Sequence, residues 1–329
     1  MFSCPLLLIK CPFASRRQRQ RLSMLMCVAL SSALACGEEV SNIFALPPPG
    51  DAVVGQLGSV VVGGHETLVD VSRANKHGFD AMVAANPGID PWVPEHGAEV
   101  VLPGLHVLPD APRQGIVVNV AEKRLYYYPR DKHGRVSSVE VYAVSVGRGD
   151  WQTPLRTTRV VAKVKNPAWY PPESVRAEHA ARGDMLPTVV PPGPDNPLGQ
   201  YVIKLTLPSY YIHGTNRENG IGMQVTHGCI RMYPADIERL ANAVPKGTPV
   251  TIINQPYKAG WKDGVLYLEV HPSLDGAGGK ADLSARSLSN TLARIRKGNP
   301  DVAIHWGEVW RVRATEQGIP LAVGERQQI

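Results

Sequence analysis

Short apolar runs separated by turn residues recur along most of this chain, and this pattern favours strands over long helices. Residues 115–120 and 124–128 are two such runs with a few polar residues between them, which is typical of a β-hairpin. Further strands are predicted at 136–146, 159–164, 201–207, 210–212, 249–253 and 265–270. The region from about 114 to 254 is therefore expected to be a mainly β domain, a sandwich or a barrel.

Before this region, a shorter unit at 58–104 combines helical and strand patterns. Two short helices are predicted at 66–76 and 79–86, and they are flanked by strands at 60–62 and 99–102. This strand, helix, helix, strand order resembles the LysM module, a small α/β domain. The resemblance implies binding to the glycan chains of cell walls, while a structural cap without a ligand stays open.

Two other regions interrupt the strand pattern. Residues 166–196 form a long Pro-rich segment with a polar helical piece at 174–182, and a segment of this length inside a domain is usually a lid or a binding wall. Residues 255–329 form a C-terminal appended segment that is expected to pack on the domain at 114–254. A helix is predicted there at 283–297, and alternation at 304–313 predicts an edge strand.

The first 35 residues have the parts of a secretory signal peptide. Arg16–Arg21 are a basic region, an apolar run follows, and Ala33-Leu-Ala35 is a small-residue cleavage site. Alternatives are a cut as late as residue 45, lipidation at Cys36 and a start at Met24. We expect export, which in a Gram-negative cell means the periplasm.

Most of the formal net charge of +6 belongs to this leader. The leader contributes five basic side chains and no acidic ones, so the rest of the chain has 35 − 5 = 30 basic and 29 acidic side chains. A nearly neutral body has no electrostatic footprint for nucleic acid, which is excluded as a partner.

The leader also accounts for most of the thiols. The other four cysteines, at positions 4, 11, 27 and 36, lie in the leader or at its edge, so Cys229 is the only one in the body of the chain. A solitary thiol flanked by Gly228, with His213 and His227 nearby in sequence, suggests a nucleophile activated by a histidine. A buried inert cysteine and structural histidines are the alternative explanation.

The two histidines are expected to have different roles. His213 ends a predicted strand and can approach Cys229 from across the site, so we assign it as general base. The Gly214 carbonyl would hold the other ring nitrogen, and the turn His227-Gly228-Cys229 would give backbone N–H groups to an oxyanion. Zinc bound by His213, His227 and Cys229 is a weaker alternative, so neither a metal nor a cofactor is expected.

The stretches His213-Gly-Thr-Asn and Thr226-His-Gly-Cys-Ile-Arg resemble the signature of the L,D-transpeptidase family, with its YkuD-type catalytic domain. Supporting stretches are 115–120, 125–129, 153–154 and 193–199. The resemblance covers roughly 114–254, and the LysM-like unit before it resembles the periplasmic Gram-negative branch. Two departures are Thr226, where serine is common, and Arg231, where some members carry asparagine.

The resemblance implies that Cys229 attacks a peptidoglycan tetrapeptide stem at the carbonyl of its third residue, releases D-alanine and forms a thioacyl-enzyme. The acyl acceptor would be an amine, either on a second stem (a 3→3 cross-link) or on an outer-membrane lipoprotein. Water as acceptor would make the protein an L,D-carboxypeptidase or another cysteine hydrolase, and a non-catalytic wall-binding protein is a further alternative. The residues expected to contact substrate are Arg231, Thr215, Asn216, Asn196 and Thr226.

Overall fold

The computed structural model describes residues 42–274 and 284–326. The expected signal peptide at 1–35 and the lipidation alternative at Cys36 lie outside the described residues. Chain contacts separate residues 1–39 from 40–329, and the elements of the fold belong to the second of these units. Within the described residues, no helix has the length and apolar character needed to cross a membrane.

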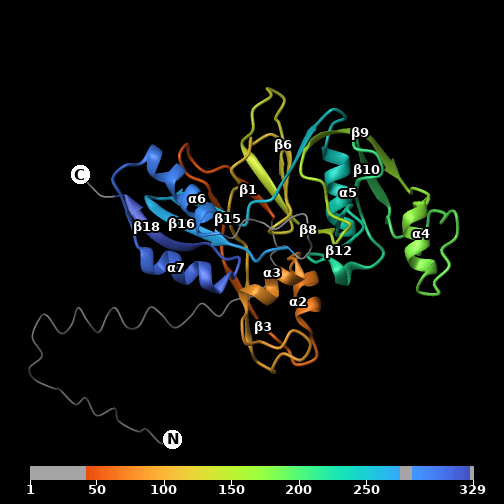
Figure 1. Ribbon diagram of the computed structural model, residues 1–329, viewed down its shortest axis with the longest axis horizontal. Coiled ribbons are helices and arrows are strands. Elements are labelled where there is room, and N and C mark those ends of the chain that lie inside the picture. The colour runs from red at the N-terminus through yellow and green to blue at the C-terminus, as the bar shows by residue number, and fades with distance from the viewer. Residues whose placement is uncertain (1–41, 275–283, 327–329) are drawn as a thin grey trace, which may run out of the picture. The chain divides into compact units, whose positions relative to one another are not determined.

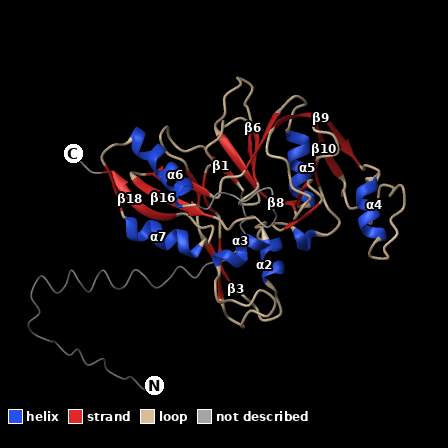
Figure 2. Ribbon diagram, viewed as in Figure 1, coloured by secondary structure: helices blue, strands red, loops and turns tan. Residues whose placement is uncertain are grey.

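One large sheet dominates the fold and closes on itself (Figures 1 and 2). Its strands are β1 (Ile43–Ala45), β6 (Gly115–Asn119), β7 (Arg124–Tyr128), β8 (Ser138–Gly147), β9 (Thr157–Lys165), β10 (Tyr201–Leu205), β11 (Tyr211–His213), β12 (Gln224–Thr226), β13 (Ile230–Met232) and β14 (Pro249–Ile253). Nine of them are ordered β1-β8-β13-β11-β10-β9-β14-β6-β7, and β12 pairs with β8 off this path. Strand β7 also pairs with β8, which closes the path. The prediction of a mainly β sandwich or barrel is confirmed.

The two longest strands, β8 and β9, join the halves of this sheet. The first part of β8 pairs with β1 and β7, whereas Val144 and Ser145 pair with β13. Alternate side chains of β8 enter two different cores: Tyr142 belongs to the one inside the sandwich, and Val141 belongs to the one on the outer face. A strand buried on both faces explains the nearly continuous apolar run that the sequence shows there.

Helix α5 (Pro234–Ala243) follows β13 and packs against β10 (Figure 1). Pro234 begins the helix at a position where a missing N–H costs nothing. Ile237 and Leu240 are fully buried in the inner core, and burying each side chain contributes about 1.5–3 kcal/mol. This helix therefore fixes the inner side of the sheet that carries the candidate site.

The N-terminal unit has the expected order of elements. It contains β2 (Val53–Gly55), β3 (Gly58–Val61), α2 (Leu68–Ala74), α3 (Phe79–Ala85), β4 (Glu99–Leu102) and β5 (Leu105–Val107). Strands β3 and β4 are antiparallel, and a capping box between Thr67 and Asp70 begins α2. The strand, helix, helix, strand prediction is confirmed, while glycan binding stays a prediction.

This unit contacts the β domain mainly through its own backbone atoms. The Phe79 N–H donates to the Ile221 carbonyl at 3.0 Å, and the Tyr233 hydroxyl donates to the His77 carbonyl at 2.9 Å. Gly78 and Gly222 approach so closely that a Cβ on Gly222 would lie 2.1 Å from the Gly78 Cα. Only glycine permits this approach.

The C-terminal segment forms a second sheet with two helices against it. Its elements are β15 (Tyr257–Lys262), β16 (Val265–Val270), α6 (Ala285–Gly298), β17 (Val302–Ile304), α7 (Trp306–Thr315) and β18 (Leu321–Arg326), with strand order β15-β16-β18-β17. The predicted edge strand at 304–313 is wrong, because most of it is helix α7. Val309 and Val312, three residues apart, are both buried, and this helical spacing outweighs the local alternation.

A buried ionic cluster joins this segment to the catalytic sheet. Its members are Glu122, Arg124 and Tyr126 from the catalytic domain and Lys258, Glu269 and His271 from the C-terminal segment, all buried. Lys258 Nζ lies 2.6 Å from Glu122 Oε2 and 3.0 Å from Glu269 Oε2. Oxygen and nitrogen atoms of Glu122, Glu269 and His271 also lie within 4.8 Å of one another, as in a metal site, but the Lys258 ammonium and the Arg124 guanidinium together already neutralise the two carboxylates. The cluster is a structural joint between the two parts.

Candidate active site

Strands β11 and β13 bring the predicted nucleophile and base together. They are parallel neighbours, with Ile212 opposite Ile230 and His213 opposite Arg231. Because side chains alternate along a strand, His213 and Arg231 project from the same face, and Cys229, two residues before Arg231, extends this row. His213 is therefore diagonal to Cys229. The spacing between strands and the rise over two residues put their Cα atoms roughly 8 Å apart.

His213 is buried and held in one tautomer. Its Nδ1 lies 2.6 Å from the Gly214 carbonyl oxygen, which can only accept, so Nδ1 carries the proton and Nε2 carries the lone pair. This is the contact that the sequence predicted for Gly214. Burial lowers the pKa of His213 to about 3, and Arg231 adds to this, while the Gly214 and Leu198 carbonyls oppose it. The imidazole is neutral at physiological pH.

Cys229 is a half-buried thiol. Its Sγ lies 3.6 Å from the carbonyl oxygen of Ser209. Burial raises the pKa of the thiol to about 11, against the opposing effects of the Tyr211 N–H and the Arg231 guanidinium. The resting pair is thus a neutral thiol beside a neutral imidazole.

The turn before Cys229 is clamped from two sides. The Thr226 hydroxyl donates to the Cys229 carbonyl at 2.6 Å and accepts from the Gly228 N–H at 3.2 Å. The Thr153 hydroxyl donates to the Gly228 carbonyl at 2.9 Å. Gly228 has φ +97°, and a Cβ there would lie 2.7 Å from the Tyr210 ring. The Gly228 N–H of the expected oxyanion turn is therefore already engaged by Thr226.

His227 faces the long Pro-rich segment. Its Nε2 donates to Glu178 Oε2 at 2.7 Å, and Glu178 belongs to helix α4 (Glu173–Ala180). The Trp151 ring lies edge-on at 4.9 Å. Among the described residues, the ligand atoms of His213, His227 and Cys229 are not a group within 4.8 Å of one another, so the structure gives no support to the zinc alternative. Burial lowers the pKa of His227, although Glu178 opposes this shift.

Sequence reasoning missed two charged residues at this place, Glu178 and Arg148. Glu178 also forms ion pairs with Arg148, which follows β8, and with Arg182, the latter at 3.0 Å. Its hydrogen bond with Arg148 is the main reason that the pKa of Glu178 falls to about 2. The polar helix at 174–182 was predicted, but nothing in the pattern indicated which element it would contact.

Three of the residues expected to contact substrate also have structural contacts in the described chain. The Asn196 side chain is fully buried: its Nδ2 donates to the Pro167 carbonyl at 2.8 Å, and its Oδ1 accepts from the Leu198 N–H at 2.9 Å. Thr215 is buried and accepts from the Arg217 N–H at 2.9 Å. Thr226 is buried in the clamp of the cysteine turn. Polar atoms of these three side chains hold the backbone of the site, and direct substrate contact through them stays a prediction.

Arg231 and Asn216 remain accessible to a substrate. Asn216 is exposed, and Arg231 is partly exposed with no partner on Nε. In the described part of the chain, no carboxylate lies within ion-pair distance of Arg231 or of Arg217. Arg217, which the sequence did not single out, lowers the pKa of Arg231 by repulsion after the larger effect of burial. Two neighbouring guanidinium groups without a carboxylate form an anion-receptive place beside Cys229.

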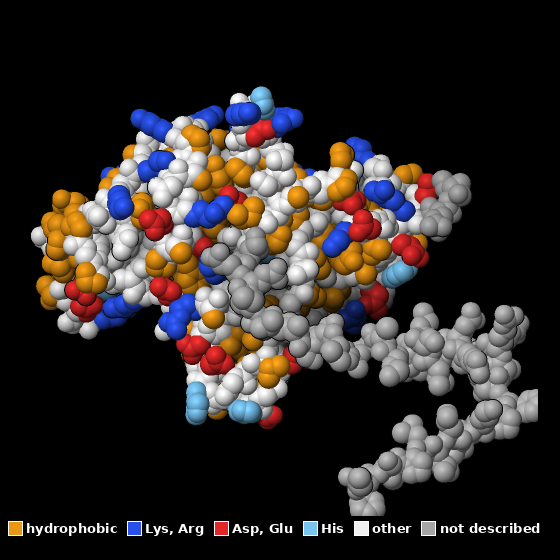
Figure 3. Space-filling view, turned by 180° about the vertical axis from the view of Figure 1, so that it is seen from behind, with side chains coloured by type: hydrophobic (Ala, Val, Ile, Leu, Met, Phe, Trp, Pro, Cys, Tyr) orange, Lys and Arg blue, Asp and Glu red, His pale blue; other side chains and the backbone are white. Residues whose placement is uncertain are grey.

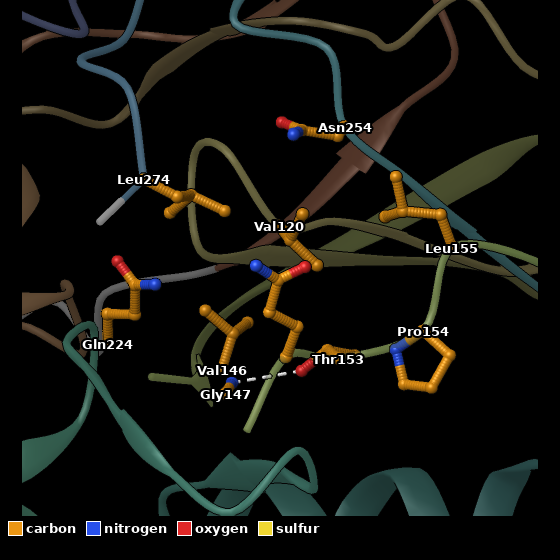
Figure 4. A pocket seen from close by; sticks show the side chains of 10 residues that line it. Val120, Val146, Gly147, Thr153, Pro154, Leu155, Gln224, Asn254 and Leu274 are labelled. Atoms are coloured by element: carbon orange, nitrogen blue, oxygen red, sulfur yellow. Dashed lines mark hydrogen bonds between the residues drawn. The ribbon is translucent and has the colours of Figure 1, made fainter. Parts of the chain in front are cut away.

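A pocket of about 280 Å³ lies behind the catalytic turn (Figure 4). Thr153, which holds the Gly228 carbonyl, lines it, and Figure 4 shows the bond from the Gly147 N–H to the same hydroxyl. Leu155, Asn254 and Leu274 line other sides. The pocket therefore adjoins the residues that support the turn.

Fold and site together define a class: a β-sandwich protein with a thiol and a neutral histidine at the ends of neighbouring strands. The model of the YkuD L,D-transpeptidase catalytic domain matches residues 113–252. The probable L,D-transpeptidase YcfS of Escherichia coli is 41% identical over 87% of this chain and 90% of that protein. The probable L,D-transpeptidase ErfK/SrfK of the same organism is 44% identical over 70% of this chain and 74% of that protein. The solved catalytic domain of an Enterococcus faecium L,D-transpeptidase is 21% identical over 44% of this chain and 100% of that one, with a TM-score of 0.33. The chain belongs to the L,D-transpeptidase family with a YkuD-type catalytic domain.

Proposed function

We propose that this protein is an L,D-transpeptidase that acts on peptidoglycan tetrapeptide stems through a thioacyl-enzyme on Cys229. The observation that carries the proposal is that His213 lies opposite Arg231 on the parallel strands β11 and β13, with Cys229 two residues before Arg231 and the His213 Nδ1 proton on the Gly214 carbonyl. Family membership supports the same activity.

The reaction begins with a neutral pair. Cys229 Sγ attacks the carbonyl carbon of the third stem residue while the thiol proton moves to His213 Nε2. The tetrahedral intermediate collapses, its carbon–nitrogen bond breaks, and the departing D-alanine amine takes the proton from His213. An acceptor amine then attacks the thioester, and its proton returns through His213 to the Cys229 sulfur.

Arg231 and Arg217 are proposed to hold an anionic group of the stem. Arg231 is next to His213 across the strands, so a carboxylate bound there would lie beside the reacting pair. A bound anion would also offset the positive charge that contributes to the low pKa of His213, and this would make the imidazole a stronger base.

The proposed cellular setting is the periplasm, after removal of a signal peptide within residues 1–35. Strand β1 pairs with β8, so a cut after Ala45 would remove an edge strand of the catalytic sheet, and this favours the earlier site. The face in Figure 3 shows basic and acidic side chains intermingled, which is consistent with a partner other than nucleic acid.

The proposed domains are a LysM-like unit at 58–104, the catalytic domain at 114–254 and the appended segment at 255–329. Glycan binding by the first is supported by Trp92, which is 60% exposed and lies 5.5 Å from the Phe79 ring. An exposed aromatic face is a suitable surface for a sugar ring.

The decisive experiment is product analysis by mass spectrometry with purified tetrapeptide stems, offering a second stem and a lysine peptide of lipoprotein type as acceptors. We expect the wild-type protein to release D-alanine and to join the acyl group to one of the amines. Cys229→Ala should lose both products while keeping the wild-type melting temperature. Continued D-alanine release by Cys229→Ala would refute the proposal, and hydrolysis without transfer would identify an L,D-carboxypeptidase.

A further inference from the structure

Helix α4 lies in the segment 166–196, which leaves β9 and returns to β10. Two backbone hydrogen bonds between Trp169 and Val190, at 2.9 and 2.8 Å, tie the two arms of this segment together. Asn196 fixes its return end. Within α4 itself, Val175 is the buried residue, so apolar packing contributes little to where the helix lies.

Polar contacts from Glu178 join α4 to the catalytic turn. One carboxylate oxygen, Oε2, accepts from His227 at 2.7 Å, and the other, Oε1, pairs with Arg148. Arg148 Nη2 lies 3.3 Å from His227 Nε2. Since both of these nitrogens carry hydrogens, the Glu178 carboxylate is their common acceptor.

The same residues form a closed circuit with the backbone of the turn. The Arg148 N–H donates to the Thr226 carbonyl at 3.0 Å, and Thr226 directly precedes His227. The circuit therefore runs from Thr226 to His227, Glu178 and Arg148 and back to Thr226. Cys229 is two residues beyond this circuit, at the end of the turn that the circuit holds.

We propose that Glu178 is a positioning residue for acyl transfer, which acts from helix α4 by fixing His227 and with it the turn that presents Cys229. The inference rests on the proposed function and assigns His227 a role separate from that of the base, His213. It also makes the seating of α4 a condition for a correctly placed thiol. A carboxylate that orients a histidine in this way is known to matter through geometry more than through its own proton transfer.

The charged and titratable groups around His227 allow a direct readout. Glu178 and His179 approach it from α4, and Arg148 approaches it from the end of β8. Arg182, just beyond α4, pairs with Glu178. Glu178 raises the pKa of His227, whereas Arg148 and His179 lower it. Loss of the Glu178 charge should therefore lower the His227 pKa, which NMR of the ring measures.

The test uses the full chain with Glu178→Ala, Glu178→Gln and the matched control Glu173→Gln, a change on the exposed first turn of the same helix. We expect Glu178→Ala to lower kcat for stem transfer by roughly ten- to a hundredfold with little change in KM. Glu178→Gln keeps one acceptor oxygen and should have a smaller effect. Both should lower the His227 pKa and speed amide exchange of residues 226–229, while Glu173→Gln matches the wild type.

Three results would overturn the inference: a wild-type kcat in Glu178→Ala, a rise in KM alone, or a loss of kcat with unchanged His227 titration and amide exchange. Failure of this inference can be distinguished from failure of the proposed function. If the wild-type protein formed no transfer product, the proposed function would fail, yet His227 titration and amide exchange would still decide whether Glu178 holds the turn.

Discussion

The protonation state of Cys229 gives the sharpest prediction from the site. The thiol has a pKa of about 11, raised by burial, and His213 has a pKa of about 3, lowered by burial. A preformed thiolate–imidazolium pair requires the opposite order of the two values. The structure therefore predicts a thiol that is almost fully protonated at neutral pH until substrate arrives.

The pKa of the thiol determines how fast Cys229 reacts with an alkylating agent at each pH. At pH 7 a thiol with a pKa of about 11 is ionised in roughly one molecule in ten thousand, against a few in a hundred for an unperturbed cysteine. Since the thiolate is the alkylated form, the rate of reaction with iodoacetamide should rise roughly tenfold per pH unit from 7 to 10. His213→Gln should change this resting rate little, because the imidazole holds no thiol proton. Arg231→Gln should slow it, because Arg231 lowers the thiol pKa.

The assay is the second-order alkylation rate of the Cys229 peptide, followed by mass spectrometry so that cysteines of the leader do not interfere. A peptide of residues 224–234 provides the unperturbed reference. A plateau in the rate below pH 8 would show a preformed thiolate and would refute the neutral-pair mechanism.

Three further predictions concern the surroundings of the site. Gly228 has φ +97°, and a Cβ there would meet the Tyr210 ring, so Gly228→Ala should displace the turn that carries Cys229. We expect product formation by transfer to fall roughly a hundredfold while far-UV circular dichroism stays unchanged. Lys258→Met leaves two buried carboxylates without their ammonium and should cost about 3–5 kcal/mol in urea unfolding, whereas Lys262→Met on the same strand should cost far less; equal losses would contradict the role of the cluster. Asp236 is buried, and its pKa is raised to about 6, so the stability it contributes is present below about pH 4 and lost as the pH rises through 6. Asp236→Asn should thus raise the melting temperature at pH 8 but not at pH 4, and an equal rise at both would contradict this sign.

The sandwich could be predicted from the sequence, and Cys229 and His213 could be singled out as candidates, because both depend on local signals. Apolar runs of five to ten residues mark strands β6, β7 and β8, and a lone thiol between glycine and histidines marks the nucleophile. Strand β15 was missed because Gly260 interrupts its apolar pattern, and α7 was misread because its amphipathic spacing is short. These errors arise where the local pattern is weak.

The roles of Glu178, Arg148 and Arg217 could not be predicted, because each depends on contacts between segments far apart in sequence. Glu178 meets His227 across 49 positions, and Arg148 meets the same ring across 79. The backbone contacts of Asn196, Thr215 and Thr226 could not be predicted for a related reason, and their substrate assignments stay predictions. A polar residue near a nucleophile has the same appearance in sequence whether it faces solvent or caps the backbone.

The contact between Gly78 and Gly222 has a consequence for how the protein would find its substrate. Two backbones that touch without side chains, with hydrogen bonds on both sides, leave little freedom for a hinge. On the proposed function, the LysM-like unit would then stay at a fixed distance from Cys229 and would not move as a domain on a flexible linker. The stem that reaches Cys229 would be the one at that distance along the glycan strand from the bound sugar. The contact between Gly78 and Gly222 would thus determine the spacing of cross-links or anchors.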